Sequence, residues 1–188
     1  MPLSALILAG GRSRRMGTDK ALLRFGGATL IEHVVRQIQP RCDELLLSVG
    51  TSDRYDFLGL PTLRDPVPEQ GPLRGIAEGL RSARHERLLV LACDLVQVPL
   101  ALVARIEYAV AGHDAAVPKT AEGYWEPLFA IYTKGCLDVI DRHLDRGELC
   151  AFGYYGELDV AVVPLAPGES LTNLNSLADL EACEPLPD

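Results

Sequence analysis

The sequence predicts a single-domain α/β protein in which helices cover a mostly parallel, twisted sheet, giving three layers. Short apolar runs bounded by turn residues recur at residues 3–8, 45–49, 88–92, 115–117, 128–132 and 160–163. Segments with helical periodicity separate most of these runs, and strands that alternate with helices form parallel sheets. The length of 188 residues suits one domain, expected over 1–188 with a frayed end at 184–188.

Helix ends are marked by specific residues. The first helix is expected to start at Thr29, because Thr29 and Glu32 have the spacing of a capping box, and to end at Pro40. Pro72 marks another start, since the first helical turn leaves its N–H groups unpaired anyway. The remaining helices are expected over residues 71–84, 100–111, 134–145 and 176–183.

The composition is that of an ordinary soluble globular protein, with 48% hydrophobic and 23% charged residues, and we expect it in the cytoplasm. No apolar run approaches the roughly 18 residues of a membrane span, and residues 3–8 are too short for a signal peptide. The formal net charge of −8 argues against a nucleic-acid partner, which would require a basic surface. The five cysteines are scattered without a C-x-x-C pair, so we expect reduced thiols.

A glycine- and arginine-rich loop follows the first predicted strand. Gly10 and Gly11 lack Cβ atoms, so backbone N–H groups can close on an oxyanion there. Five cations cluster in this segment of an otherwise acidic chain: Arg12, Arg14, Arg15, Lys20 and Arg24. The spacing fits neither G-x-G-x-x-G nor G-x-x-x-x-G-K-[ST]. We therefore predict a phosphate-binding loop of another kind, with a plain glycine-rich turn as the alternative.

This loop resembles the signature of the nucleotidyltransferases that act on the molybdenum cofactor, and in particular of their guanylyl-transferring members. The matching residues are Leu8-Ala9-Gly10-Gly11-x-Ser13-x-Arg15-Met16-Gly17-x-Asp19-Lys20-Ala21-Leu22-Leu23. The resemblance implies a Rossmann-like fold of the nucleotide-diphospho-sugar transferase type. It also implies transfer of GMP from GTP to molybdenum-molybdopterin with release of pyrophosphate, and Mg²⁺ as cofactor.

Asp94 directly follows the predicted strand at 88–92, and ligands of open parallel sheets bind beyond the carboxyl ends of the strands. A carboxylate there can hold Mg²⁺ while phosphates and water complete the coordination shell. The resemblance implies the same role, although the family usually has proline where this chain has Val96. The alternative is a residue that caps a helix or orders a loop.

Asp65 and the segment from Gly71 to Gly75 match the part of the family that lines the nucleotide pocket. The two glycines let a helix start approach a ligand closely. Asp65 can accept hydrogen bonds from the N1–H and amino edge of guanine, or from ribose. A turn and helix start without a ligand is the alternative.

Asn173 and Asn175 resemble the family's Asn-x-Asn-Thr-Pro, whose amides lie near the metal and the second substrate; here Ser176 and Leu177 replace Thr-Pro. Asparagine also favours turns for local reasons. Trp125 falls where the family faces the pterin, so it either stacks on the pterin or packs in the core.

The resemblance thus assigns roles residue by residue. Catalytic roles are expected for Lys20, Arg15 and Asp94, and metal binding for Asp94. Nucleotide binding is expected from Leu8, Ala9, Gly10, Gly11, Arg12, Lys20, Asp65, Gly71, Asp94, Asn173 and Asn175. The expected partners are GTP, molybdopterin, molybdenum cofactor biosynthesis proteins and acceptor apoenzymes, with no nucleic acid and no membrane.

The pair Gly10-Gly11 favours GTP, because the related cytidylyltransferase tends to have Ala-Gly there. Three alternatives stay open: a molybdopterin cytidylyltransferase using CTP, a sugar or polyol nucleotidyltransferase, and a non-catalytic accessory protein that only binds the cofactor or a partner. The histidines lie away from every candidate loop and have no expected role. The sequence contains no H-E-x-x-H spacing and suggests no Ser-His-Asp arrangement.

Overall fold

A computed structural model describes residues 1–10, 19–25, 27–50, 54–67, 69–166 and 168–172. Across these residues, seven strands form one sheet in the order β5-β4-β1-β6-β8-β7-β9. The strands are β1 Ser4–Leu8, β4 Glu44–Gly50, β5 Thr62–Arg64, β6 Arg87–Ala92, β7 Ala115–Lys119, β8 Phe129–Thr133 and β9 Val160–Pro164. A separate two-stranded ribbon consists of β2 (Arg24–Phe25) and β3 (Ala28–Thr29).

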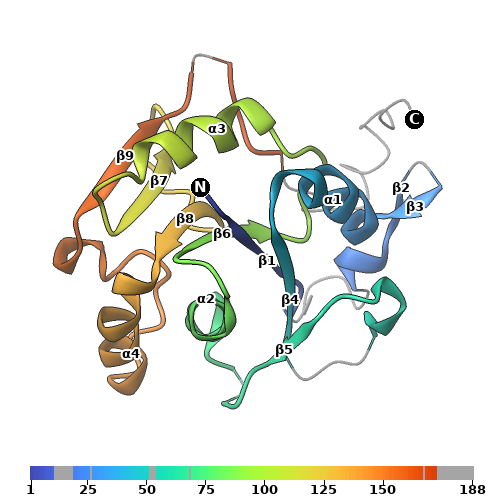
Figure 1. Ribbon diagram of the computed structural model, residues 1–188, viewed down its shortest axis with the longest axis horizontal. Coiled ribbons are helices and arrows are strands. Elements are labelled where there is room, and N and C mark those ends of the chain that lie inside the picture. Colours follow the sequence, from blue (N-terminus) through green and yellow to red (C-terminus); the bar gives the residue numbers. More distant parts are fainter. Residues whose placement is uncertain (11–18, 26, 51–53, 68, 167, 173–188) are drawn as a thin grey trace.

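Helices cover both faces of the sheet, with α1 and α3 on one side and α2 and α4 on the other (Figure 1). They are α1 Leu30–Ile38, α2 Gly71–Ser82, α3 Leu100–Ala109 and α4 Leu137–Asp145. The predicted three-layer α/β architecture is therefore confirmed. The expected helix at 176–183 and the frayed end at 184–188 lie outside the described residues.

The predicted start of α1 is confirmed in atomic detail. The Thr29 side chain accepts a hydrogen bond from the Glu32 N–H, and the Glu32 carboxylate accepts one from the Thr29 N–H, which completes the capping box. Pro40 lies in a 3₁₀ turn, Gln39–Arg41, immediately after α1.

The end of α2 differs slightly from the prediction. The helix ends at Ser82 rather than at Arg84, because the Arg84 N–H donates to the Glu44 carboxylate instead of continuing the helix.

Strand direction follows from the connections. β1 pairs in parallel with both β4 and β6, whereas β8 runs antiparallel to both β6 and β7. A helix between two strands returns the chain to the end of the sheet where the first strand began, so the second strand runs parallel to the first. No helix separates β7 from β8, so β8 runs in the opposite direction to β7. The sheet is mostly parallel, as predicted.

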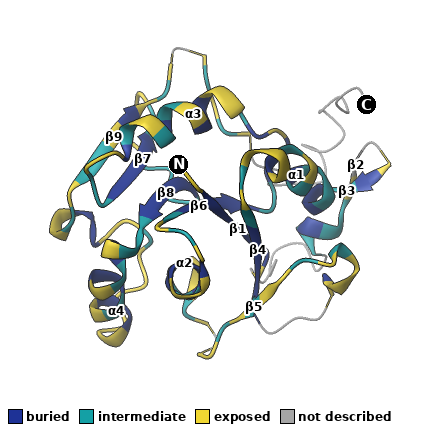
Figure 2. Cartoon of the chain, viewed as in Figure 1, coloured by how far each residue is buried: buried dark blue, intermediate teal, exposed yellow. Residues whose placement is uncertain are grey.

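The core lies between the sheet and the two helical layers. Leu6 and Ile7 of β1 point to opposite faces and are both fully buried, as expected for a central strand covered on both sides. Figure 2 shows the buried central strands and the exposed outer faces of the helices. Where the structure is described, no helix is long and apolar enough to cross a membrane.

Candidate nucleotide-binding site

The carboxyl ends of β1, β4 and β6 meet at one edge of the sheet. The Ala9 N–H donates to Ser48 O over 2.8 Å, and the Cys93 N–H donates to Leu8 O over 3.3 Å. Asp65, which follows β5, donates its N–H to Gly50 O over 3.0 Å. These bonds gather the ends of four strands, so the candidate residues that follow them lie along a common edge.

Gly10 has a structural reason to be glycine. A Cβ at Gly10 would lie 2.7 Å from Gly50 N, closer than real Cβ contacts allow. Gly50 itself has a φ of +60°, a conformation that side chains disfavour. The chain after β1 therefore passes directly against the end of β4, which sets where the predicted phosphate loop begins.

Lys20 and Asp94 face each other across the site. The Lys20 Nζ lies 3.9 Å from the Asp94 Oδ2, and the two side chains are 22% and 23% exposed. Burial raises the pKa of Asp94, while the Lys20 ammonium opposes this effect. The pair thus combines a cation that can reach phosphate with a partly desolvated carboxylate that favours a cationic partner.

Asp65 carries an unpaired oxygen. Its Oδ1 is buried and has no hydrogen-bond partner among the residues that the structure describes. Burial, and then the neighbouring Glu78 carboxylate, raise the pKa of Asp65, while Arg74 lowers it. A buried acceptor without a donor is unfavourable, so this oxygen is available to a ligand that supplies N–H or O–H groups.

Gly75 brings the first turns of α2 close to the same edge, whereas a Cβ at Gly71 would meet no atom of the described residues within 4 Å. Gly71, the first residue of α2, has a φ of +64°. A Cβ at Gly75 would lie 2.7 Å from the Leu8 Cδ2 and 2.9 Å from the Ser48 Oγ, so the helix packs directly on β1 and β4. Packing against Leu8 and Ser48 accounts for glycine at position 75, and the expected approach of this helix start to a ligand stays a prediction.

Comparisons with known proteins identify the family. The MobA-like NTP transferase domain matches residues 5–157. The chain belongs to this family. Two relatives named molybdenum cofactor guanylyltransferase cover most of it: the protein from Desulfosudis oleivorans is 34% identical, covering 97% of this chain and 94% of its own. The protein from Pseudomonas putida is 39% identical and covers 78% of each chain.

A solved structure of molybdopterin-guanine dinucleotide biosynthesis protein A from Archaeoglobus fulgidus has a TM-score of 0.80 and 26% sequence identity, covering 95% of each chain. The predicted fold class and nucleotidyltransferase activity of this MobA-like enzyme are thereby confirmed.

Several predicted site residues lie outside the described residues: Gly11, Arg12, Arg15, Asn173 and Asn175. Their roles stay predictions. Thr172, the last described residue, has a defined place: its carbonyl oxygen accepts a hydrogen bond from the Val96 N–H over 3.1 Å. The segment before Asn173 is thus tied to the loop that follows Asp94.

Trp125 in this MobA-like enzyme is partly buried and already has neighbours. Its ring meets Tyr155 edge-on at a centroid distance of 5.1 Å, and the Lys119 Nζ lies 4.3 Å from its centroid. Lys119 thus covers the ring. These contacts favour the packing interpretation over stacking on a pterin.

Cys93 directly precedes Asp94 but is not suited to act as a nucleophile. Burial raises the pKa of its thiol to about 12, so the thiol stays protonated.

His143 has structural partners. Its Nδ1 lies 2.7 Å from the Glu148 Oε2 and its Nε2 lies 2.8 Å from the Glu157 Oε1, so the buried ring links α4 to the chain that follows it.

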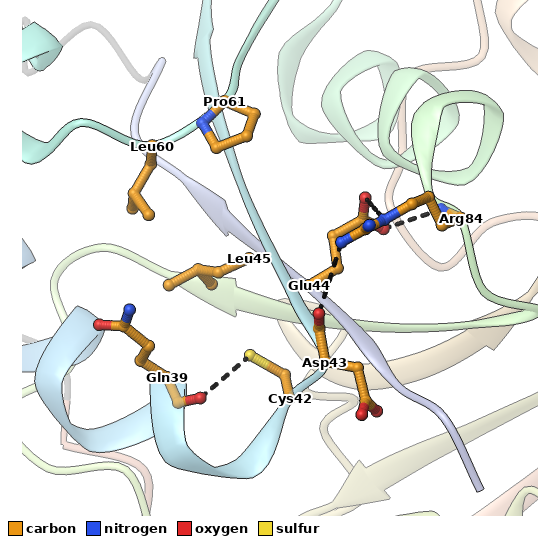
Figure 3. A pocket seen from close by; sticks show the side chains of 8 residues that line it. All are labelled: Gln39, Cys42, Asp43, Glu44, Leu45, Leu60, Pro61 and Arg84. Atoms are coloured by element: carbon orange, nitrogen blue, oxygen red, sulfur yellow. Dashed lines mark hydrogen bonds and ion pairs between the residues drawn. The ribbon is translucent and has the colours of Figure 1, made fainter.

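A surface hollow of about 570 Å³ lies at the opposite end of β4. Figure 3 shows the side chains that line it. Its lining residues are Gln39, Cys42, Asp43, Glu44, Leu45, Leu60, Pro61 and Arg84. The Glu44 carboxylate accepts hydrogen bonds from the Ser4 hydroxyl and from Arg84, and Asp43 accepts one from the Leu3 N–H. Two carboxylates would repel a triphosphate, so the candidate nucleotide site is at the other end of the sheet.

Tyr55 is a site residue that sequence reasoning missed. Its side chain is buried, and its hydroxyl lies 2.7 Å from the Asp19 Oδ2 and 3.0 Å from Ala9 O. Burial and the hydrogen bond to Asp19 raise the pKa of Tyr55 far above its usual range. No motif surrounds this tyrosine, so only the structure could reveal it.

Proposed function

We propose that the chain transfers GMP from GTP to molybdenum-molybdopterin. A phosphate oxygen of molybdopterin attacks the α-phosphorus of GTP, a new phosphoanhydride bond forms, and the bond to the departing pyrophosphate breaks. The observation that carries the proposal is that the Lys20–Asp94 pair and the buried, unpaired Oδ1 of Asp65 lie along the same edge of the sheet, in a chain whose relatives are named guanylyltransferases.

The chemistry requires little proton transfer. A phosphate nucleophile is already ionised at neutral pH, so it needs no general base. The main obstacle is repulsion between two anionic substrates, which an enzyme overcomes by positioning them and by neutralising their charge. In this chain Lys20 supplies a positive charge for the phosphates of GTP.

Asp94 fits a role as a magnesium ligand. Its carboxylate is mostly desolvated, and burial raises its pKa, so a divalent cation would stabilise the charged form. In the described part of the chain, no group of three or more His, Cys, Asp or Glu side chains is placed to hold a metal. Mg²⁺ commonly binds through one or two carboxylates plus substrate phosphates, and when bound it would neutralise phosphate charge.

The buried, unpaired Oδ1 of Asp65 supports a contact with guanine, and replacing Asp65 tests which base is recognised. We expect Asp65→Asn to lower kcat/KM for GTP by about tenfold or more, because a charged acceptor for two guanine donors is lost. ITP lacks the amino group of guanine, so the wild-type protein should prefer GTP over ITP and the variant should lose that preference. Steady-state kinetics with both nucleotides measure this.

Asp56→Asn serves as the control for the Asp65 variant, since Asp56 is exposed and lies in the turn before β5. Its nucleotide preference should remain that of the wild type. Equal losses for GTP and ITP in Asp65→Asn would contradict a contact with the amino edge of the base.

Asp65 should also make stability depend on pH. Its folded-state pKa is raised above the ordinary value of 3.8, so the folded protein holds this proton more tightly than the unfolded chain. Its contribution to stability is present at low pH and is lost as pH rises from about 3.8 through the raised pKa. Thermal unfolding of Asp65→Asn and wild type should diverge in the variant's favour across that window.

A constant difference in unfolding temperature between the two proteins from about pH 3.5 to 7 would contradict a raised pKa. The comparison depends only on the change with pH, so any fixed cost of the buried amide cancels.

The proposed reaction is tested by pyrophosphate release from the purified protein with Mg²⁺ and molybdenum-loaded molybdopterin, with GTP and CTP in parallel. Release with GTP alone is expected. Release with CTP alone would mean a cytidylyltransferase, and binding without release would favour an accessory protein. A cytoplasmic location, and partnership with biosynthesis proteins and acceptor apoenzymes, remain predictions.

A further inference from the structure

One buried hydroxyl joins the two segments that flank the candidate phosphate loop. Tyr55 is 1% exposed, and its Oη lies 3.0 Å from Ala9 O and 2.7 Å from the Asp19 Oδ2. Ala9 directly follows β1, and Asp19 directly precedes Lys20. The same hydroxyl therefore contacts the chain where it leaves the sheet and where it returns with the candidate catalytic lysine.

The two contacts of the hydroxyl differ in strength. A phenol has one proton to donate, and a carboxylate accepts it more strongly than a carbonyl does, in keeping with the shorter distance to Asp19. Because the site is desolvated, water competes poorly for this bond. Asp19 is thus held by the hydroxyl of Tyr55, whose ring belongs to the same core cluster as Ala9 at the end of β1.

The position of Asp19 determines where Lys20 begins. The Asp19 carboxylate is 11% exposed, lies 3.2 Å from the Arg54 Nη1, and accepts a hydrogen bond from the Ala21 N–H. It therefore caps the 3₁₀ turn Lys20–Leu22, whose Ala21 is fully buried. A shift of Asp19 would move this turn, and with it the Lys20 Nζ that lies 3.9 Å from Asp94.

We propose that Tyr55 is a positioning residue for nucleotide binding and transfer. Through its hydroxyl it holds Asp19 against the end of β1, and Asp19 in turn sets Lys20 against Asp94 and the phosphates of the nucleotide. This inference rests on the proposed function for the role of Lys20. Tyr55 itself touches no reacting atom.

Tyr55→Phe tests the role of the hydroxyl alone, since the ring that packs in the core is kept. We expect the dissociation constant for GTP with Mg²⁺ to rise about tenfold by titration calorimetry. Partial unfolding would lower the binding stoichiometry instead, so the two quantities separate misplacement of Lys20 from a loss of folded protein. In turnover, kcat should fall while KM for molybdopterin stays unchanged.

A double-mutant cycle with Lys20→Ala tests whether Tyr55 acts through Lys20. If it does, Tyr55→Phe should add little once Lys20 is gone, and the double variant should bind GTP as weakly as Lys20→Ala alone. Asp19→Asn provides an independent route to the same result, because it removes the charged acceptor without changing the core. It should weaken GTP binding in the same direction.

Tyr132→Phe is the matched control. Tyr132 is also fully buried, and its hydroxyl contacts the Pro127 carbonyl at 2.9 Å and the Tyr155 hydroxyl at 2.6 Å, in the core on the other face of the sheet. Its loss should leave GTP affinity unchanged, whatever it does to the unfolding temperature.

Three results would overturn the proposal: GTP affinity in Tyr55→Phe within twofold of wild type, an effect that multiplies with that of Lys20→Ala, or an equal loss in Tyr132→Phe. GTP binding is measured without molybdopterin. Wild-type protein that binds GTP but transfers no GMP would therefore contradict the proposed function and leave the test of Tyr55 intact.

Discussion

Replacing Asp94 with alanine is expected to reduce pyrophosphate release by about 10³-fold or more, to the limit of detection. The carboxylate directly follows β6, where it can hold Mg²⁺ beside the phosphates, and burial raises its pKa, so a cation would stabilise its charged form. Asp94→Asn should fail in the same way, because the amide has nearly the same shape but no charge. Pyrophosphate release at saturating GTP, titrated with Mg²⁺, measures both variants.

Asp145→Ala is the control for Asp94, since Asp145 is an exposed carboxylate at the end of α4. It should retain wild-type turnover and magnesium dependence. An Asp94→Ala protein that releases pyrophosphate at a near-normal rate would remove Asp94 from the metal site.

Lys20→Ala should lower turnover by roughly 10²-fold or more, the scale seen when one preorganised donor to a developing negative charge is removed. KM for GTP should rise as well, because the same ammonium attracts the phosphates of the bound substrate. The ion pair with Asp94 spans 3.9 Å and is partly exposed, so it contributes little to folding. The unfolding temperature should therefore stay close to that of the wild type.

Lys134→Ala is the matched control for Lys20. Lys134 lies at the other end of the sheet, where its N–H donates to Glu86 O just before β6. Its loss should leave kcat and KM unchanged. Near-normal kinetics in Lys20→Ala would mean that another cation neutralises the phosphates of GTP, and the role assigned to Lys20 would be wrong.

Much of the fold could be predicted because its signals are local. The capping box of Thr29 and Glu32 depends on residues three positions apart, and the structure forms it as expected. The apolar runs of the central strands identify them because both faces of the sheet are covered. Six of the strands lie within two residues of their predicted ends.

Other elements could not be predicted, because neighbours decide them. β5 has only three residues, Thr62–Arg64, and none of its side chains is buried, so it shows no apolar pattern. It is a strand because it pairs with β4. The antiparallel direction of β8 likewise depends on how the chain connects β7 to it.

The candidate site divides in the same way. Lys20 and Asp94 could be identified from the loop, from a strand end and from the family resemblance. Tyr55 could not, since its contacts reach Ala9 and Asp19, 46 and 36 positions away in the sequence. No periodicity or motif links residues at such separations.

The sequence by itself determined the alternation of strands and helices, the helix caps and the chemical groups that follow the strands. Only the tertiary structure decided which of these groups meet: Lys20 with Asp94, Tyr55 with Asp19, and Gly10 with Gly50. The physical reason is that caps and periodicity arise within a few residues, whereas burial and hydrogen bonding between distant segments depend on the order of strands in the sheet.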